Sequence, residues 1–454
     1  MQRSMRLLGW SAFAALTAFV GPALADAPAS HAAHGAVALA FDPDQATRAW
    51  LNTMDAAAVH RSNSYFEGGY WIQIVGPLIS IAIGFAILQL GWAKNLRAWL
   101  ERNLKVYFLV AVGFAFFYTL ASIVSFPWDY WVGFVREHDY GLSRQNFGQW
   151  FTEYMESFAI NLVIASLAIG LLYLIIAAAK KNWWVWGAGA TIVFAAFMVM
   201  AAPVLIAPIF NTYTPMQDGP LKASVLQLAQ ASGVPADNVY VFDVSRQSNR
   251  ATANVSGLGG TTRISMADNL ITRESPAGVR AVLGHEIGHY VLDHSVSIMV
   301  MLTLLILGVY ALANWLFNKL SAGERWGIRS ISDPAGMPLL FAIISFLLLL
   351  ATPIQNNITR FHEHQADIFG LNAAREPDGF AESALLLSEY RKMEPSPLEE
   401  WLFYDHPSGY QRIHMAMVWK AHHMALGDIA PGPGGPPPGW RPDFVVMRQQ
   451  SQSH

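Results

Sequence analysis

Six long apolar stretches constrain what this chain can fold into more than any other feature of its sequence. They lie at about residues 71–93, 106–126, 157–179, 183–207, 296–316 and 337–353. Most are long enough to cross a hydrocarbon core of roughly 30 Å as helices, and the last is near the lower limit. Only 13% of the 454 residues are charged and 53% are hydrophobic, which is unusual for a soluble domain. We predict a predominantly α-helical, polytopic protein of the lipid bilayer.

The first 25 residues have the pattern of a secretory signal peptide. Arg3 and Arg6 form a basic start, an apolar run follows from Leu7 to Val20, and Ala23-Leu-Ala25 is a small-residue cleavage site. The alternative is an uncleaved anchor helix, which would make seven transmembrane helices instead of six. Residues 26–70 are Ala-rich and then polar, and we interpret them as an exported leader to the first retained helix.

Basic residues are distributed unevenly among the segments between the spans. The loops 94–105, 180–182 and 317–336 carry nine, namely Lys94, Arg97, Arg102, Lys105, Lys180, Lys181, Lys319, Arg325 and Arg329. The segments 26–70 and 127–156 carry only Arg48, Arg61, Arg136 and Arg144. Because cytoplasmic loops are enriched in Lys and Arg, the first group is predicted to be cytoplasmic. Residues 208–295 and those after 354 then lie on the other side, which for a bacterial inner membrane is the periplasm.

A metal-binding pattern stands shortly before the fifth span. In His285-Glu286-Ile-Gly-His289 the two histidines are four residues apart, so on a helix both imidazoles point the same way. Ser275 and Pro276 predict the start of that helix, as an N-cap followed by proline. Two imidazole nitrogens at this spacing suit Zn²⁺, which leaves a position for water in catalytic sites. Glu286 is placed to take a proton from that water.

The composition of the chain limits which residue types can bind a metal ion and which classes of partner the protein can bind. The chain has no cysteine, so disulfides and thiolate metal sites are excluded and His, Asp and Glu remain as ligands. The formal net charge of −3 predicts no nucleic-acid partner.

A third ligand must lie on the same side of the membrane as the two histidines. Two spans follow residue 289, so the chain crosses the membrane and returns after Pro353. There Glu363 and Asp367 are four residues apart on one helical face. One carboxylate can bind the metal, and the other can orient a ligating histidine by accepting its second ring N–H. His362 and His364 compete with Glu363 for the ligand role.

Several separate motifs together resemble one known family. They are His285-Glu286-Ile-Gly-His289, Glu363-His-Gln-Ala366-Asp367, Asp405-His406-Pro407-Ser408 with Arg412-Ile413, the loop Glu137–Gln145, and Pro208–Asn211 with Thr214-Pro215. The chain is similar, over roughly residues 65–425, to the membrane-embedded zinc metallopeptidases typified by the type I CAAX prenyl protease. The familiar members have seven helices and a site that faces the cytosol, opposite to what the loop charges predict here.

This resemblance implies roles position by position. It makes His285, His289 and Glu363 the ligands of one Zn²⁺, Glu286 the general base, and Asp367 the group that orients a ligand. His406 and Arg412 would bind substrate and stabilise the oxyanion. The implied activity is that of a membrane-bound zinc metalloendopeptidase acting on peptides or proteins. The alternative is a polytopic membrane protein that binds zinc without catalysis, such as a transporter or a quality-control scaffold.

Residues 208–295 read as the first half of a catalytic module. We expect a helix at 220–232 and short strands at 239–243 and 263–266. The strand at 251–256, with Ala253, Asn254, Val255 and Ser256, is a plausible edge for an extended peptide substrate, or else an ordinary hairpin strand. The two spans at 296–353 form a transmembrane hairpin, 354–427 the second half of the module, and 428–454 a flexible tail rich in Pro and Gly.

Overall fold

The computed structural model describes residues 41–257, 262–323, 325–430, 432 and 434–444. The signal-peptide pattern at residues 1–25 and the first part of the leader lie outside the described residues. The rest of the leader forms helix α2 (Pro43–Leu51) and the first turns of α3 (Ala56–Gln89). Asp42 caps α2, because its side chain accepts hydrogen bonds from the backbone N–H groups of Asp44 and Gln45.

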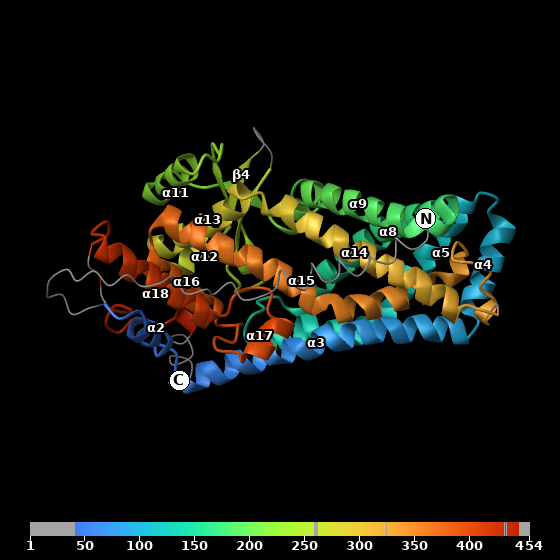
Figure 1. Ribbon diagram of the computed structural model, residues 1–454, viewed down its shortest axis with the longest axis horizontal. Helices are drawn as coiled ribbons and strands as arrows, with labels where there is room; N and C mark the ends of the chain where they lie inside the picture. Colours follow the sequence, from blue (N-terminus) through green and yellow to red (C-terminus); the bar gives the residue numbers. More distant parts are fainter. Residues whose placement is uncertain (1–40, 258–261, 324, 431, 433, 445–454) are drawn as a thin grey trace, which may run out of the picture. The chain divides into compact units, whose positions relative to one another are not determined.

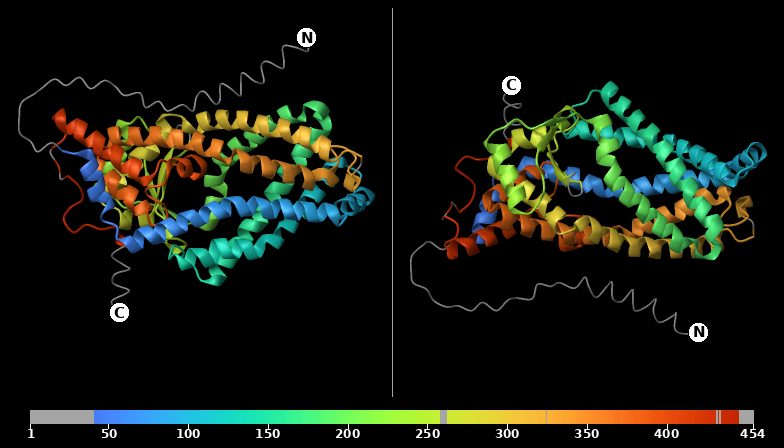
Figure 2. Two further views of the ribbon diagram at one scale, coloured as in Figure 1. Left: turned by 60° about the horizontal axis from the view of Figure 1, so that its bottom comes forward. Right: turned by 90° about the horizontal axis from the view of Figure 1, so that it is seen from above.

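Six long helices correspond to the six predicted spans. They are α3 (Ala56–Gln89), α5 (Tyr107–Ala121), α8 (Phe147–Ala179), α9 (Trp183–Leu205), α14 (His294–Leu320) and α15 (Met337–Ala374). Among the described residues, they belong to five apolar helical stretches long enough to cross a membrane, because α8 and α9 adjoin at the tight turn 180–182. Figure 1 and the two views in Figure 2 show these helices side by side, with α4 (Trp92–Asn103) across one end of the bundle.

Two of these helices are longer than the apolar spans. Helix α3 starts at Ala56 instead of residue 71, and α15 continues without a break from Met337 to Ala374. Pro353 lies inside α15 and does not end it. The expected boundary between hairpin and catalytic module at residue 353 therefore falls within a helix, which extends from the membrane span to the residues of the predicted site.

Short helical segments continue the chain between the spans and around the module. They are α6 (Phe126–Tyr130), a π-helical turn (Trp131–Val135), α7 (Arg136–Asp139) and α10 (Ala207–Phe210). The helices of the catalytic module are α11 (Pro220–Ala231), α12 (Asp268–Arg273), α13 (Pro276–Val291), α16 (Pro377–Leu387), α17 (Pro397–Phe403) and α18 (Gly409–Ala425). The module occupies the end of the bundle away from α4 (Figure 1).

A small sheet supports α13. Its strands are β1 (Tyr213–Pro215), β2 (Val239–Phe242), β3 (Ala253–Ser256) and β4 (Arg263–Ala267), in the order β1-β2-β4-β3. β2 and β4 are parallel, and the other two pairings are antiparallel. Buried apolar residues of the sheet, α11 and α13 form one core, which includes Val225, Ile264, Leu283 and Ile287. β3 is therefore an edge strand beside the helix that carries the two histidines.

Glycines let α13 and α15 approach closely. A Cβ atom on Gly370 of α15 would lie 2.8 Å from the backbone N of His285. On α13, a Cβ on Gly284 would lie 3.0 Å from the carbonyl O of Gly370, and one on Gly288 would lie 3.2 Å from Cα of Ala366. Side chains at these positions would push the helices apart. The absence of Cβ atoms thus brings the His285–His289 segment against the Glu363–Asp367 segment.

The tail predicted to be flexible makes defined contacts at its described end. The Trp440 ring packs edge-on against Trp50 of α2, with ring centroids 5.1 Å apart. Asp443 accepts two hydrogen bonds from Arg273, at 2.6 and 2.8 Å, and Phe444 is only 3% exposed. Residues 440–444 are therefore attached to the catalytic module.

Candidate metal centre and active site

The helix that presents the two histidines begins where the sequence predicts. Ser275 accepts a hydrogen bond from Gly278 N at 3.1 Å and so caps α13, with Pro276 as its first residue. Glu382 of α16 accepts hydrogen bonds from both the backbone N and the Oγ of Ser275, at 2.9 and 2.6 Å. This start fixes the register in which His285 and His289 face α15.

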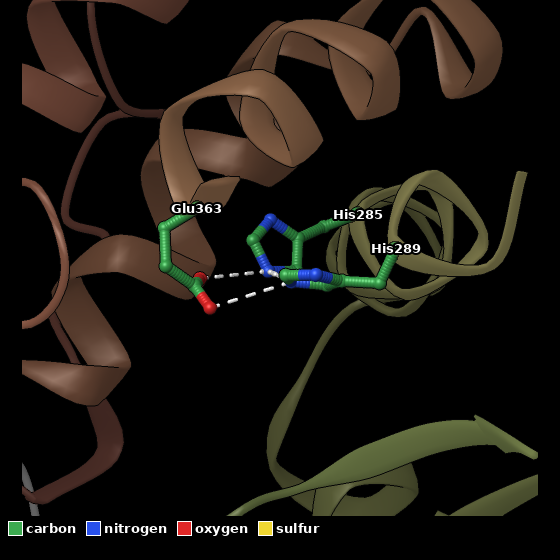
Figure 3. A group of neighbouring side chains, drawn as sticks. All are labelled: His285, His289 and Glu363. Carbon is green, nitrogen blue, oxygen red and sulfur yellow. Dashed lines mark hydrogen bonds and ion pairs between the residues drawn. The ribbon is translucent and has the colours of Figure 1, made fainter. Parts of the chain in front are cut away.

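Three side chains from two distant segments converge on one point. The Nε2 atoms of His285 and His289 are 3.1 Å apart. Glu363 Oε2 lies 3.2 Å from Nε2 of His285, and Glu363 Oε1 lies 3.4 Å from Nε2 of His289. Figure 3 shows both imidazoles on α13 facing the carboxylate on α15. The helical hairpin α14–α15 thus returns the third side chain to the pair of histidines.

These atoms fit a tetrahedral metal ion. Ligand atoms at about 2.0–2.2 Å from such an ion lie about 3.3–3.6 Å from one another, close to the separations observed here. Glu363 is buried, and its Oε2 makes no well-aligned hydrogen bond among the described residues, although Nε2 of His285 lies 3.2 Å away. A buried carboxylate is unfavourable unless a cation or hydrogen-bond donors bind it. The donor set therefore fits a metal that takes nitrogen and oxygen ligands.

The competing histidines point elsewhere. His362 Nδ1 contacts the carbonyl O of Ile358 and its Nε2 contacts Ser297 Oγ, both at 2.7 Å. His364 is exposed on the surface of α15. Glu363 is therefore the side chain of this segment that meets the pair of histidines.

A buried carboxylate orients the first histidine. Asp367 Oδ1 lies 2.7 Å from Nδ1 of His285, and Arg412 of α18 donates from Nε to Asp367 Oδ2 at 3.0 Å and from Nη2 to Oδ1. Burial lowers the pKa of His285, but the neighbouring carboxylates of Asp367 and Glu363 outweigh this effect and raise the pKa to about 9. The carboxylates around His285 thus favour positive charge at this point.

A cavity of about 520 Å³ opens beside the three side chains. Its lining includes His285, Glu286, His406 and Arg412, together with Thr252 and Ala253 next to and on the edge strand. Glu286 reaches this cavity from α13, and burial raises its pKa above the usual value. The arrangement places a carboxyl group, an imidazole and an open strand edge around one space next to the candidate metal position.

His406 approaches the same carboxylate from the loop before α18. Its Nε2 lies 3.2 Å from Glu363 Oε2, and its Nδ1 lies 2.8 Å from Asp405 Oδ1. Ser408 then caps α18 by accepting from Gln411 N, which brings Arg412 into the first turn of that helix and onto Asp367. Both side chains of the predicted His406–Arg412 motif therefore reach the wall of the cavity, His406 against Glu363 and Arg412 against Asp367.

Comparison with known protein families shows which family this chain matches. Two family descriptions match: peptidase family M48 over residues 215–420, and the CAAX prenyl protease N-terminal region with five membrane helices over residues 44–212. The chain belongs to peptidase family M48. The family predicted from the motifs is thereby confirmed, and this M48 chain is a membrane-bound metalloprotease, not a non-catalytic zinc-binding protein.

Relatives of the M48 chain cover most of its length. It is 28% identical over 351 residues to the uncharacterized metalloprotease YhfN of Bacillus subtilis. The aligned region covers 76% of this chain and 82% of that protein. It is 27% identical over 393 residues to CAAX prenyl protease 1 of Saccharomyces cerevisiae, covering 79% and 86% of the two chains. The crystal structure of S. mikatae Ste24p shares the fold, with a TM-score of 0.68 at 22% identity over 83% of this chain and 95% of that one.

The sequence alone does not show that one acidic residue, Glu274, is buried in the wall of the cavity. Glu274 precedes the N-cap of α13 and lines the cavity, where it accepts a hydrogen bond from Ser383 Oγ at 3.0 Å. Burial, together with the nearby Glu382 carboxylate, raises its pKa to about 8. No spacing or motif marks Glu274, because its burial depends on the packing of α16 against α13.

Proposed function

We propose that this M48 peptidase hydrolyses peptide bonds with one Zn²⁺ held by His285, His289 and Glu363. The observation that supports this most is the convergence of three side chains, whose contacting nitrogen and oxygen atoms lie 3.1–3.4 Å apart, beside a cavity that His285 and Glu286 line. Nitrogen and oxygen donors in this number leave a fourth tetrahedral position, as in catalytic zinc sites.

Each side chain has a separate task in this proposal. Bound zinc would lower the pKa of water towards about 7 and polarise the scissile carbonyl. Glu286 takes the proton from the attacking water and then delivers it to the leaving amine. His406, held at Nδ1 by Asp405, faces the cavity with Nε2 and contacts the oxyanion, a contact worth about 3–4 kcal/mol in well-measured cases. Arg412 holds Asp367 and adds positive charge behind the centre.

The edge strand β3 supplies the surface for the substrate. Within the part of the chain that the structure describes, residues Ala253–Ser256 pair with β4 alone, with Asn254 opposite Ser265. An extended peptide can add to the free edge through main-chain hydrogen bonds, whatever its side chains. We propose that short or damaged membrane-associated peptides bind there, with their scissile bond over the candidate zinc position.

Three variants test the proposed centre. Glu286→Ala should retain one zinc ion per chain yet lose nearly all cleavage of casein or an unfolded peptide, because only the proton acceptor is removed. Glu363→Ala should lose zinc as well as activity. His364→Ala is the matched control on the same helix and should behave as the wild type. A fully active Glu286→Ala enzyme, or a wild type indifferent to chelators, would contradict the proposal.

The natural substrate can be captured with the same inactive form. Cells that make Glu286→Ala should accumulate the peptides that the wild type degrades. Mass spectrometry of their membrane-associated peptides, compared with cells that make the wild type, would identify the class of substrate. If no peptides accumulate, the proposed substrate class is wrong.

We further propose that the protein lies in a bacterial inner membrane, with its metal centre on the periplasmic side. The basic loop residues Arg97, Lys180 and Arg329 lie in the connections α3–α5, α8–α9 and α14–α15, whereas the metal centre lies in the module away from α4 (Figure 1). The positive-inside bias then places the module outside the cytoplasm. Alkaline phosphatase fused after residue 454 should be active, and green fluorescent protein fused there should be dark after Sec export. The reverse pattern would place the centre in the cytoplasm.

A further inference from the structure

The second histidine of the candidate centre has a buried imidazole neighbour that the mechanism above does not use. His294 is 2% exposed, and its Nδ1 lies 3.0 Å from Nδ1 of His289. The ring centroids are 5.0 Å apart and the ring planes are inclined by 77°. His289 therefore faces Glu363 with Nε2 and His294 with Nδ1.

A break between α13 and α14 produces this contact. In an uninterrupted helix, five residues turn the chain by about 500°, so His294 would point about 140° away from His289. Instead, α13 ends at Val291, and Asp293 adopts a left-handed conformation with φ +52° before α14 starts at His294. Such a conformation is uncommon outside glycine, and Asp is one of the residues that tolerates it. The turn folds His294 back over the ring of His289.

The ring of His294 packs against that of another histidine, His362. His362 of α15 packs edge-on against it, with centroids 4.9 Å apart and planes at 81°. The tautomer and orientation of the His362 ring are fixed by two hydrogen bonds. Its Nδ1–H donates to the carbonyl O of Ile358, and its Nε2 accepts from Ser297 Oγ, both at 2.7 Å. The two helices of the membrane hairpin thus supply both rings behind His289.

We propose that His294 is a positioning residue: its Nδ1 accepts a hydrogen bond from Nδ1–H of His289 and so keeps the Nε2 lone pair of His289 directed at the metal. This inference rests on the proposed function, since it assigns Nε2 of His289 to the metal. A neutral imidazole carries one ring proton, so a proton held at Nδ1 leaves Nε2 free to bind. Asp367 does the same for His285, at 2.7 Å.

The arrangement gives each metal-binding histidine its own acceptor. Asp367 is a carboxylate on α15, and His294 is an imidazole at the start of α14. Partners of this kind fix the tautomer and ring orientation of a ligand, and their loss costs about 10–100-fold in metal affinity. We therefore expect His294 to act on zinc affinity without touching the metal or the substrate.

The role of Nδ1 is tested by two substitutions, one that keeps a hydrogen-bond acceptor at the position of Nδ1 and one that moves it outward by one bond. Asn carries Oδ1 on Cγ, where His carries Nδ1, whereas Gln carries its oxygen one bond further out. Zinc affinity of the full-length protein in detergent is measured by competition with a chromophoric chelator. His294→Ala and His294→Gln should bind zinc about 10–100-fold more weakly than the wild type, and His294→Asn should stay within about threefold. His364→Ala should match the wild type.

The melting temperature of each metal-free variant separates positioning from packing. If His294→Asn binds zinc as weakly as His294→Ala, or if affinity falls in proportion to the metal-free melting temperature in all three variants, the proposal is overturned. It is also overturned if all three variants bind zinc as the wild type does. A wild type that binds no zinc in the same titration instead contradicts the proposed metal centre itself.

Discussion

Asp367 accepts hydrogen bonds from two buried groups at once, His285 and Arg412, and is itself fully buried. Asp367→Asn would leave the Arg412 guanidinium buried without its counter-charge. Loss of one partner of a buried ion pair typically costs about 3–5 kcal/mol of stability, and loss of the acceptor behind a ligand costs about 10–100-fold in metal affinity. Thermal melting in detergent and zinc competition would show both effects.

A double variant serves as the control for this substitution. Asp367→Asn combined with Arg412→Gln removes the unpaired charge, so it should melt at a higher temperature than Asp367→Asn alone. Its zinc affinity should remain low, because His285 still lacks its carboxylate partner. If the double variant is no more stable than the single one, the ion pair does not account for the loss.

Glu274 should make stability depend on pH. Burial raises its pKa from 4.5 to about 8. Between these values the folded protein holds a proton that the unfolded chain has released, so the free energy of unfolding contributed by this group falls as pH rises from about 4.5 to about 8. Glu274→Gln keeps the shape without the charge. Its advantage in melting temperature over the wild type should be absent near pH 4.5 and largest above pH 8.

A second glutamate controls for general effects of charge. Glu394 is exposed and pairs with Arg48, so Glu394→Gln removes an acid outside the cavity. Melting curves of the wild type and both variants are recorded at each pH. A constant difference between Glu274→Gln and the wild type across this range would show that Glu274 is not buried in its neutral form.

Spacing along the chain predicted which residues share a helical face, and the family resemblance selected Glu363 over His362 and His364. His285 with His289, and Glu363 with Asp367, are pairs four residues apart, and helical geometry alone places each pair on one face. His294 and Glu274 could not be predicted in the same way. The first depends on the left-handed turn at Asp293, and the second on the packing of α16.

At the level of elements, the contact between α13 and α15 depends on glycine. A Cβ atom on Gly370 would lie 2.8 Å from the backbone N of His285, which cannot move without shifting α13. Gly370→Ala should therefore separate the two helices and cost about 1–3 kcal/mol, as overpacking usually does. Because the proposed zinc ligands lie on both helices, zinc affinity should fall together with the melting temperature.

The matched control for this substitution lies in the neighbouring helix. A Cβ atom on Gly308 of α14 would meet no atom within 4 Å. Gly308→Ala should leave both zinc affinity and melting temperature close to the wild type. If Gly370→Ala also leaves both unchanged, the close approach of the helices is not needed to form the centre.

Apolar spans predict that helices exist, but not where they end. All six predicted spans overlap long helices, because hydropathy marks the part that crosses the lipid. A helical face at Glu363 and Asp367 was predicted, but not its continuity with the span through Pro353, because proline usually ends or kinks a helix. The extension of α15 beyond Pro353 carries Glu363 and Asp367, so the membrane span and the proposed metal ligand belong to one continuous helix.

At the level of the whole molecule, the described end of the tail binds Arg273, which also contacts two other parts of the catalytic module. Arg273 at the end of α12 donates to Asp443 of the tail and to Glu389 after α16, and it also donates to the carbonyl O of Asn249 before the edge strand. Trp440 packs on Trp50 of α2. Composition rich in Pro and Gly predicted a flexible tail and could not reveal these contacts, which depend on single side chains such as Trp440 and Asp443.

A truncation series tests whether this tail holds the module together. A chain that ends at residue 438 lacks Trp440, Asp443 and Phe444, so it loses the ring contact, a bidentate ion pair and a buried apolar side chain. Its melting temperature should fall by several degrees relative to a chain that ends at residue 444, which keeps all three. Asp443→Asn in the full chain should lower it less, because only the charge is removed. If truncation at residue 438 changes neither the melting temperature nor resistance to an added protease, the tail contributes nothing to the stability of the module.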